Sequence, residues 1–173
     1  MDQSAHIDEA GNDSESWLDC ADDLITSRDT LCSCREEAES KVPKSGVRVL
    51  PAESSSYWVE LMLVGFAIEN LLKSLWLAKG GKLYEAGKLK PWGLKAKFHD
   101  LPAIANHVGW DLLEGEKHDL GMLSRIMTGA GRYPFERDTT VFPHLEGWSN
   151  ISDDRMCGFV KRLRNEIRKI QRS

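Results

Sequence analysis

Apolar residues recur with a helical period along most of the chain. The first such segment begins near Trp17 and ends near Ser40, with apolar positions three or four residues apart. The last segment begins at Ser152, which two aspartates follow, as is typical of a helix N-terminus; its second face is basic. We find no strand alternation of useful length and no internal repeat. The pattern therefore predicts an all-α fold, a four-to-five-helix bundle with antiparallel neighbours.

A central segment is apolar on nearly every face. It is expected to begin at Ser55 or Ser56 and to end at the glycine pair 80–81. A helix without a polar side belongs at the centre of a bundle, and Gly65 within it indicates a close contact with another helix. The longest apolar run, Leu61 to Ile68, is shorter than the roughly 20 residues that a bilayer requires. We therefore expect no membrane span.

Two shorter helices are predicted after a lysine-rich loop. Asp100 can cap the first, with Pro102 in its first turn and Gly109 at its end. The second covers Glu116 to Met127. A long loop, Gly129 to Gly147, then precedes the last helix, and loops of this length inside a compact domain are usually functional or disordered. Its aromatic content favours order.

Length and composition predict one globular domain. The chain has 173 residues, of which 41% are hydrophobic and 29% charged. Residues 1–13 are polar, acidic and without period, so we expect a flexible acidic N-terminal arm followed by a single helical domain, residues 14–173. The net charge of −4 conceals an acidic N-terminal region and a basic C-terminal helix, and a basic patch can attract phosphate-bearing partners. The loop lysines are best interpreted as solvated side chains: Lys82, Lys88, Lys90, Lys95 and Lys97.

Four cysteines occur without a secretory signal before them, which favours a reduced, cytoplasmic protein. Cys32 and Cys34 are two residues apart on a predicted helix, so their side chains point in different directions. We expect neither a metal site nor a cofactor.

Glu69 and Lys73 are two charges inside the apolar central helix. Residues four apart share a helix face, so they form either an intrahelical ion pair at the edge of the core or part of a polar site. His99 and Asp100 follow further along the chain, and either can help to cap the helix that begins there.

Four blocks in this order resemble the HEPN superfamily. They are residues 66–75 with Glu69 and Lys73, the glycine pair 80–81, residues 99–101 (His-Asp-Leu) and residues 131–134 (Gly-Arg-Tyr-Pro). The resemblance implies a helical bundle that forms a homodimer. Many HEPN proteins are metal-independent ribonucleases of toxin–antitoxin and phage-defence systems, and others are inactive binding modules.

The resemblance also implies the site. Catalytic members carry an Arg with a polar neighbour, followed by a His, and here Arg137 and His144 have six residues between them. The His would transfer a proton to or from a ribose hydroxyl or the leaving oxygen, while the Arg would neutralise charge on the phosphate. Arg164-Asn165 in the last helix also resembles the Arg-polar start, but no His follows it. The remaining site residues, implied to bind the ligand, are Glu69, Lys73, His99, Asp100, Arg132 and Tyr133.

Two hypotheses follow. The first is a cytoplasmic RNA-directed toxin or defence component that cleaves RNA without metal and acts with an antitoxin or other partner protein. The second is a non-catalytic helical module that binds a nucleotide, a nucleic acid or a partner protein through the same polar site.

Overall fold

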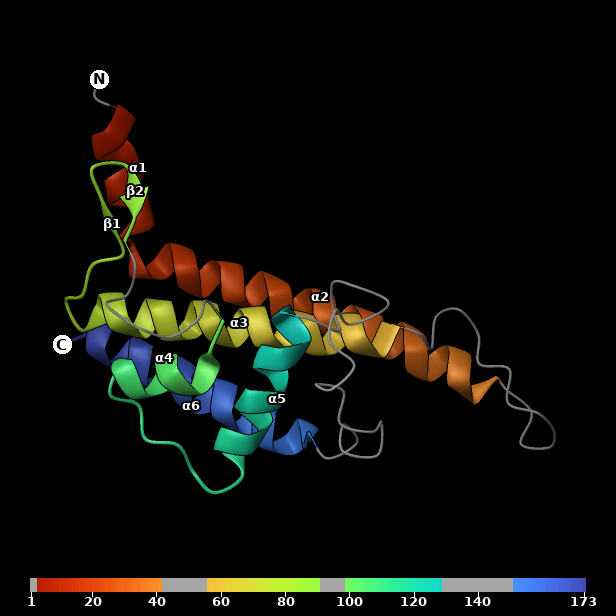
Figure 1. Ribbon diagram of the computed structural model, residues 1–173. Helices are drawn as coiled ribbons and strands as arrows, with labels where there is room; N and C mark the ends of the chain where they lie inside the picture. Colours follow the sequence, from red (N-terminus) through yellow and green to blue (C-terminus); the bar gives the residue numbers. More distant parts are fainter. Residues whose placement is uncertain (1–2, 42–55, 91–98, 129–150) are drawn as a thin grey trace.

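The computed structural model describes residues 3–41, 56–90, 99–128 and 151–173, and these are mostly helical (Figure 1). The prediction of an all-α bundle is confirmed. The described elements are α1 (Gln3–Gly11), α2 (Ser14–Ser40), α3 (Tyr57–Ala78), β1 (Tyr84–Glu85), β2 (Lys88–Leu89), α4 (Leu101–His107), α5 (Glu116–Thr128) and α6 (Asp153–Gln171).

Helix α3 is the centre of the bundle, as its apolar sequence predicts. It packs against α2, α4, α5 and α6, and α2 runs antiparallel along it (Figure 1). Ile68, Leu71, Leu72 and Leu75 are fully buried in this helix. Burying four such side chains contributes roughly 1.5–3 kcal/mol each, so packing around α3 is the main source of stability.

Length and composition alone would let α3 cross a membrane, since Tyr57–Ala78 is 22 residues long and apolar. Other helices cover it, however, and 61% of its most apolar window is buried inside the protein. This arrangement is compatible with the core helix of a soluble protein.

Gly65 allows α3 and α5 to approach closely. A Cβ atom at this position would lie 2.5 Å from Sδ of Met127, a buried residue of α5. The close helix contact predicted from this glycine is confirmed. Any larger side chain here must displace Met127 from the core.

The ends of the helices follow local capping rules. The side chain of Asp100 accepts a hydrogen bond from the backbone of Ala103 and so begins α4, and Ser152 begins α6 in the same way. Asp13 caps α2, which therefore starts at Ser14 rather than near Trp17. The residues between the cap and Trp17 are polar, so the apolar period does not reveal that the helix begins before Trp17.

The N-terminal arm is a correction to the sequence analysis. Residues Gln3–Gly11 form helix α1, which lies against a small hairpin made by β1 and β2 (Figure 1). The second strand of that hairpin, Lys88–Leu89, lies in the lysine-rich segment expected to be a loop. Contacts between segments more than 70 residues apart create both elements, and neither carries a local signal.

Asp8 holds the turn of this hairpin. Ala86 and Gly87 both have positive φ, 53° and 72°, which is the conformation of a tight hairpin turn and is unfavourable for alanine. The carboxylate of Asp8 accepts hydrogen bonds from both backbone N–H groups, at 2.8 and 2.7 Å. Asn12 adds further bonds to the backbone of Leu83 and Tyr84.

We expect the Asp8→Ala substitution to loosen the arm without unfolding the bundle. Loss of two charge-assisted hydrogen bonds should weaken the local structure by about 1.5 kcal/mol, so amide exchange in residues 83–89 should accelerate about tenfold. Hydrogen exchange read by mass spectrometry checks this. Glu9→Ala, a neighbouring exposed acid, is the control. Equal exchange in both variants would contradict the role of Asp8.

Candidate functional site

A buried polar cluster joins three of the predicted binding residues. One carboxylate oxygen of Glu69 forms an ion pair with Nζ of Lys73 at 2.9 Å, and the other contacts Nδ1 of His99 at 2.7 Å. The side chains of Glu69 and Lys73 are only 9% and 12% exposed. The prediction of an intrahelical ion pair between Glu69 and Lys73 is confirmed, and the structure adds His99 to it.

The cluster connects three segments of the chain. Lys73 also lies over the ring of Trp17 in α2, 4.4 Å from its centroid. His99 packs edge-on against Phe66 and holds a left-handed backbone with φ of 71° just before α4. Both carboxylate oxygens of Glu69 have a partner within the cluster, so its buried charge is compensated there. The cluster fastens α2, α3 and the start of α4 together.

Asp100 does not belong to this cluster, although it follows His99 directly. Its carboxylate accepts from the backbone of Ala103 and so caps α4. The backbone N–H of Leu101 is bound instead by Ser124 of α5, at 2.9 Å. Asp100 therefore has a structural role within the described residues.

Four other predicted site residues lie outside the described residues. They are the implied catalytic pair and two implied binding residues, namely Arg137, His144, Arg132 and Tyr133.

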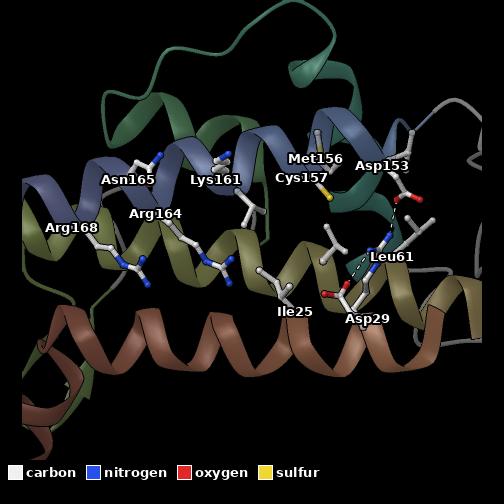
Figure 2. Close-up of a pocket in the computed structure, with 14 residues that line it drawn as sticks. Ile25, Asp29, Leu61, Asp153, Met156, Cys157, Lys161, Arg164, Asn165 and Arg168 are labelled. Carbon is white, nitrogen blue, oxygen red and sulfur yellow. Dashed lines mark hydrogen bonds and ion pairs between the residues drawn. The ribbon is translucent and has the colours of Figure 1, made fainter. Parts of the chain in front are cut away.

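A groove lies between α2 and α6 in the described part of the chain. It has a volume of about 460 Å³, and α3 forms its floor (Figure 2). The apolar lining of the groove consists of Ile25, Leu61, Val64, Met156 and Val160, with Leu61 and Met156 toward the end that carries Asp29 and Asp153 and Ile25 nearer the middle (Figure 2). Sites of this size and lining are typical of small-molecule binding.

Two ion pairs bridge the groove from α2 to α6. Arg28 bonds Asp153 at 2.7 Å, and Arg164 pairs with Asp22. Burial opposes the charge of Arg28, but its bond to Asp29 and the attraction of Asp153 outweigh this effect and raise its pKa. The Nε atoms of Arg28 and Arg164 are buried and have no hydrogen-bond partner among the described residues.

Two further cations on the groove are exposed and lack an acidic partner. Lys161 and Arg168 line it together with Asn165, and neither forms an ion pair with a carboxylate of the described ranges. By contrast, Arg155 and Arg162 on the other side of α6 pair with the buried acids Asp119 and Glu116 of α5. The basic face of α6 therefore has two parts: arginines paired with acids of α5, and the groove-lining cations Lys161 and Arg168, which form no ion pair among the described residues.

The basic face of α6 is visible in the sequence, but the groove beside it is not. Arg164 and its neighbour Asn165 lie three and four residues after Lys161, and Arg168 lies four after Arg164, so all four share one side of the helix. That spacing is the signal that could have located the groove edge. The α2 side, with Arg28, lies more than 120 residues away in the sequence and shows no local signal.

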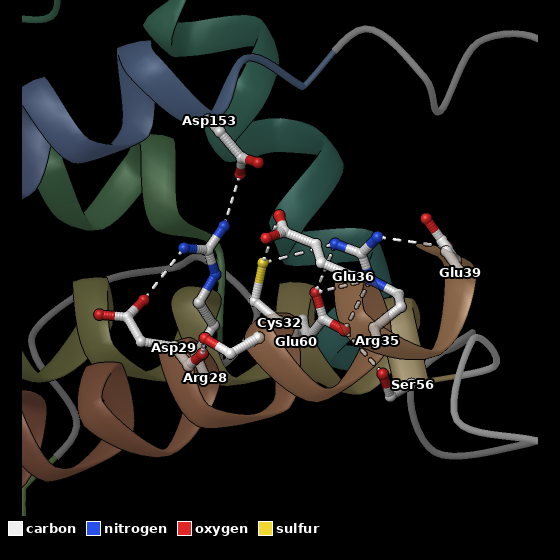
Figure 3. A network of polar contacts seen from close by, with 10 residues as sticks. Arg28, Asp29, Cys32, Arg35, Glu36, Glu39, Ser56, Glu60 and Asp153 are labelled. Carbon is white, nitrogen blue, oxygen red and sulfur yellow. Dashed lines mark hydrogen bonds and ion pairs between the residues drawn. The ribbon is translucent and has the colours of Figure 1, made fainter. Parts of the chain in front are cut away.

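A dense polar network adjoins the groove at the C-terminal half of α2 (Figure 3). Arg35 donates to the buried Glu60 of α3 at 3.0 Å, and Ser56 donates to the same carboxylate at 2.7 Å. Cys32 bonds Glu36, and burial together with this bond raises the pKa of its thiol. Cys32 therefore stays protonated at neutral pH and is a poor nucleophile. The network stabilises the α2–α3 contact.

No group of three or more His, Cys, Asp or Glu side chains in the described ranges is arranged to hold a metal ion. The chemistry that the described residues offer is binding of an anion next to an aliphatic surface. Lysine and arginine supply the charge, and the guanidinium nitrogens supply directed donors.

Comparisons with known proteins give no match, whether with family models, curated proteins or solved structures. The resemblance to HEPN proteins therefore rests on the sequence blocks alone.

We expect Glu69→Gln to destabilise the protein by about 2 kcal/mol, because it leaves Lys73 poorly paired in a largely buried position. Denaturant unfolding measures this. In a Lys73→Met background the same change should cost less, which a double-mutant cycle detects. The exposed pair Glu85–Lys90 is the control, where Glu85→Gln should cost much less because solvent screens the pair. An equal loss of unfolding free energy at both sites would contradict the role of Glu69 in fastening these helices together.

Proposed function

We propose that this chain is a helical module that binds the phosphate of an RNA or nucleotide in the α2/α6 groove. The observation that carries the proposal is the set of unpaired donors there. Lys161 and Arg168 lack acidic partners among the described residues, and the Nε atoms of Arg28 and Arg164 are buried without hydrogen bonds. An anion with several oxygen atoms can accept from such a set.

The balance of charge favours an anionic ligand. Four basic side chains line the groove, Arg28, Lys161, Arg164 and Arg168, against the carboxylates of Asp29 and Asp153 in its lining and of Asp22, which pairs with Arg164. Phosphate suits this arrangement because guanidinium groups bind it through two parallel hydrogen bonds.

The aliphatic middle favours a ligand that carries more than a phosphate. Ile25, Val64 and Val160 offer an apolar surface that a base or ribose face can contact. A groove of about 460 Å³ suits a small ligand, whereas a docked protein helix needs a longer apolar surface. A nucleotide or a short part of an RNA strand fits both the charge and the size.

Catalysis is a second proposal, which the HEPN resemblance supports through Arg137 and His144. In it, His144 acts as acid and base in metal-independent transesterification of RNA, and Arg137 or Arg132 stabilises the phosphate. On the same resemblance, the protein acts as a toxin or defence component in the cytoplasm, as a homodimer, with an antitoxin or other partner protein.

We expect the wild-type protein to bind a short fluorescent single-stranded RNA, and Lys161→Glu and Arg168→Glu each to weaken it about tenfold. Each change removes one charge-assisted contact, worth about 1.5 kcal/mol, and lowers the salt dependence of binding by roughly 0.7 per contact. Anisotropy titrations at several salt concentrations measure both quantities.

Two exposed cations outside the groove provide matched controls for these variants. Lys117 lies on α5 and Arg172 lies at the end of α6, and neither lines the groove. Lys117→Glu and Arg172→Glu change net charge equally, so they should reduce affinity much less. If all four variants lose affinity alike, the protein attracts RNA by net charge and the groove is not the site.

For the catalytic proposal, we expect cleavage of RNA in the presence of EDTA and at least a 100-fold loss of rate in His144→Ala. Gel analysis of a labelled RNA follows the reaction. Binding affinity in this variant should stay close to wild type, which separates catalysis from binding. Metal-independent cleavage that persists in His144→Ala would exclude His144 as the acid or base.

A further inference from the structure

We infer that the α2/α6 groove holds a single nucleotide unit, with its phosphate at the Arg164 end and its base on the aliphatic middle. The inference rests on the proposed function and adds the size and orientation of the ligand. Three features support it: the ion-pair bridges, the length of the groove and the distribution of charge along it.

The two ion-pair bridges delimit the aliphatic part of the groove, which continues past Arg164 to Arg168. Arg28 and Asp153 connect α2 to α6 at one end, and Asp22 and Arg164 connect the same helices further along. The aliphatic residues Ile25, Val64 and Val160 line the groove together with these bridging arginines. A strand that continued along the groove would have to break a bridge or pass over it, whereas one nucleotide lies between them.

The length of the groove agrees with this size. Asp153 and Arg164, which form the two bridges, are eleven residues apart on α6, which corresponds to about 16.5 Å along the helix axis. One extended nucleoside monophosphate fits within this span. The volume of about 460 Å³ also falls within the range of sites for small ligands.

The charges set the orientation. Arg164 and Arg168 lie at one end of the groove with the single carboxylate of Asp22, and Asp29 and Asp153 lie at the other end with the single cation of Arg28 (Figure 2). The carboxylates of Asp29 and Asp153 are more than half exposed, at 61% and 62%, so they would repel a phosphate but can accept hydrogen bonds from an amino group or a hydroxyl. We therefore expect bases with an exocyclic amino group to bind more tightly than uracil.

Calorimetric titration with AMP, UMP and inorganic phosphate, compared with a ten-nucleotide RNA, tests the inference. We expect the affinity of AMP to lie within about tenfold of that of the RNA at one site per chain. Inorganic phosphate should bind at least tenfold more weakly than AMP, because it cannot use the aliphatic middle. UMP should lie between them.

A pair of variants on α3 tests the position of the base. Val64→Phe fills the middle of the groove and should weaken AMP binding at least tenfold. Val59 lies on the same helix, is 39% exposed and does not line the groove. The Val59→Phe variant should therefore bind AMP as tightly as the wild-type protein. Circular dichroism verifies that both variants are folded.

Thiol labelling gives a second measurement on the unchanged protein, which holds if Val64→Phe does not fold. Cys157 is exposed and lines the groove, whereas Cys34 is exposed on α2 and does not. Saturating AMP should slow alkylation of Cys157 by N-ethylmaleimide at least fivefold and leave Cys34 unchanged. Equal rates with and without AMP would place the nucleotide elsewhere and overturn the inference.

The outcomes separate this inference from the proposed function. If the RNA binds through Lys161 and Arg168 but AMP neither binds nor competes, the groove binds RNA and the single-nucleotide inference is wrong. If inorganic phosphate binds as tightly as AMP, the aliphatic middle holds no base and the inference is again wrong. If neither the RNA nor AMP binds, the proposed function fails as well.

Discussion

The structure depends on the burial of helix α3. This helix is apolar on nearly every face, so it must be covered on all sides, and α2, α4, α5 and α6 provide that cover. The arrangement of these four helices follows from the requirement to enclose α3. Gly65 shows how tightly they do so, because its missing side chain is replaced by Met127 of α5.

Each carboxylate that α3 buries has a cationic partner, on α2 for Glu60 and on α3 itself for Glu69. Glu60 binds Arg35 of α2, and Glu69 binds Lys73 and His99 (Figure 3 shows the first network). An unpaired carboxylate at these depths would cost several kcal/mol, so the pairs restrict how α2 and α4 dock against α3. The charges inside the apolar helix thus specify which neighbours it accepts, and their contacts leave little capacity for a ligand.

The sequence predicted the elements whose causes are local. The apolar period located α3 and α6, and single side chains such as Asp100 and Ser152 located helix starts. The Glu69–Lys73 pair was predictable because four residues make one helical turn. Helix α1 and the hairpin were not predictable, since each requires bonds such as that of Asp8 to Gly87, across 79 positions.

The groove was unpredictable for the same reason. One wall has a visible signal, the spacing of Lys161, Arg164 and Arg168, but the opposite wall belongs to α2 and the floor to α3. Partnering also decides which cations remain available, and no periodicity reveals that Arg162 is paired with Glu116 while Lys161 is unpaired among the described residues. The implied catalytic residues Arg137 and His144 lie outside the described part of the chain, so their role stays a prediction.

Two ion pairs fasten the walls of the groove to each other. α3 lies between α2 and α6, and the ion pairs Arg28–Asp153 and Asp22–Arg164 span the gap above it. Dissolved ions screen exposed charges more than buried ones, and each pair joins a largely buried arginine to a more exposed carboxylate, 62% for Asp153 and 38% for Asp22. Ionic strength therefore acts on the contact between the two walls as well as on the attraction of the groove for anions, whereas the apolar core around α3 carries no such dependence.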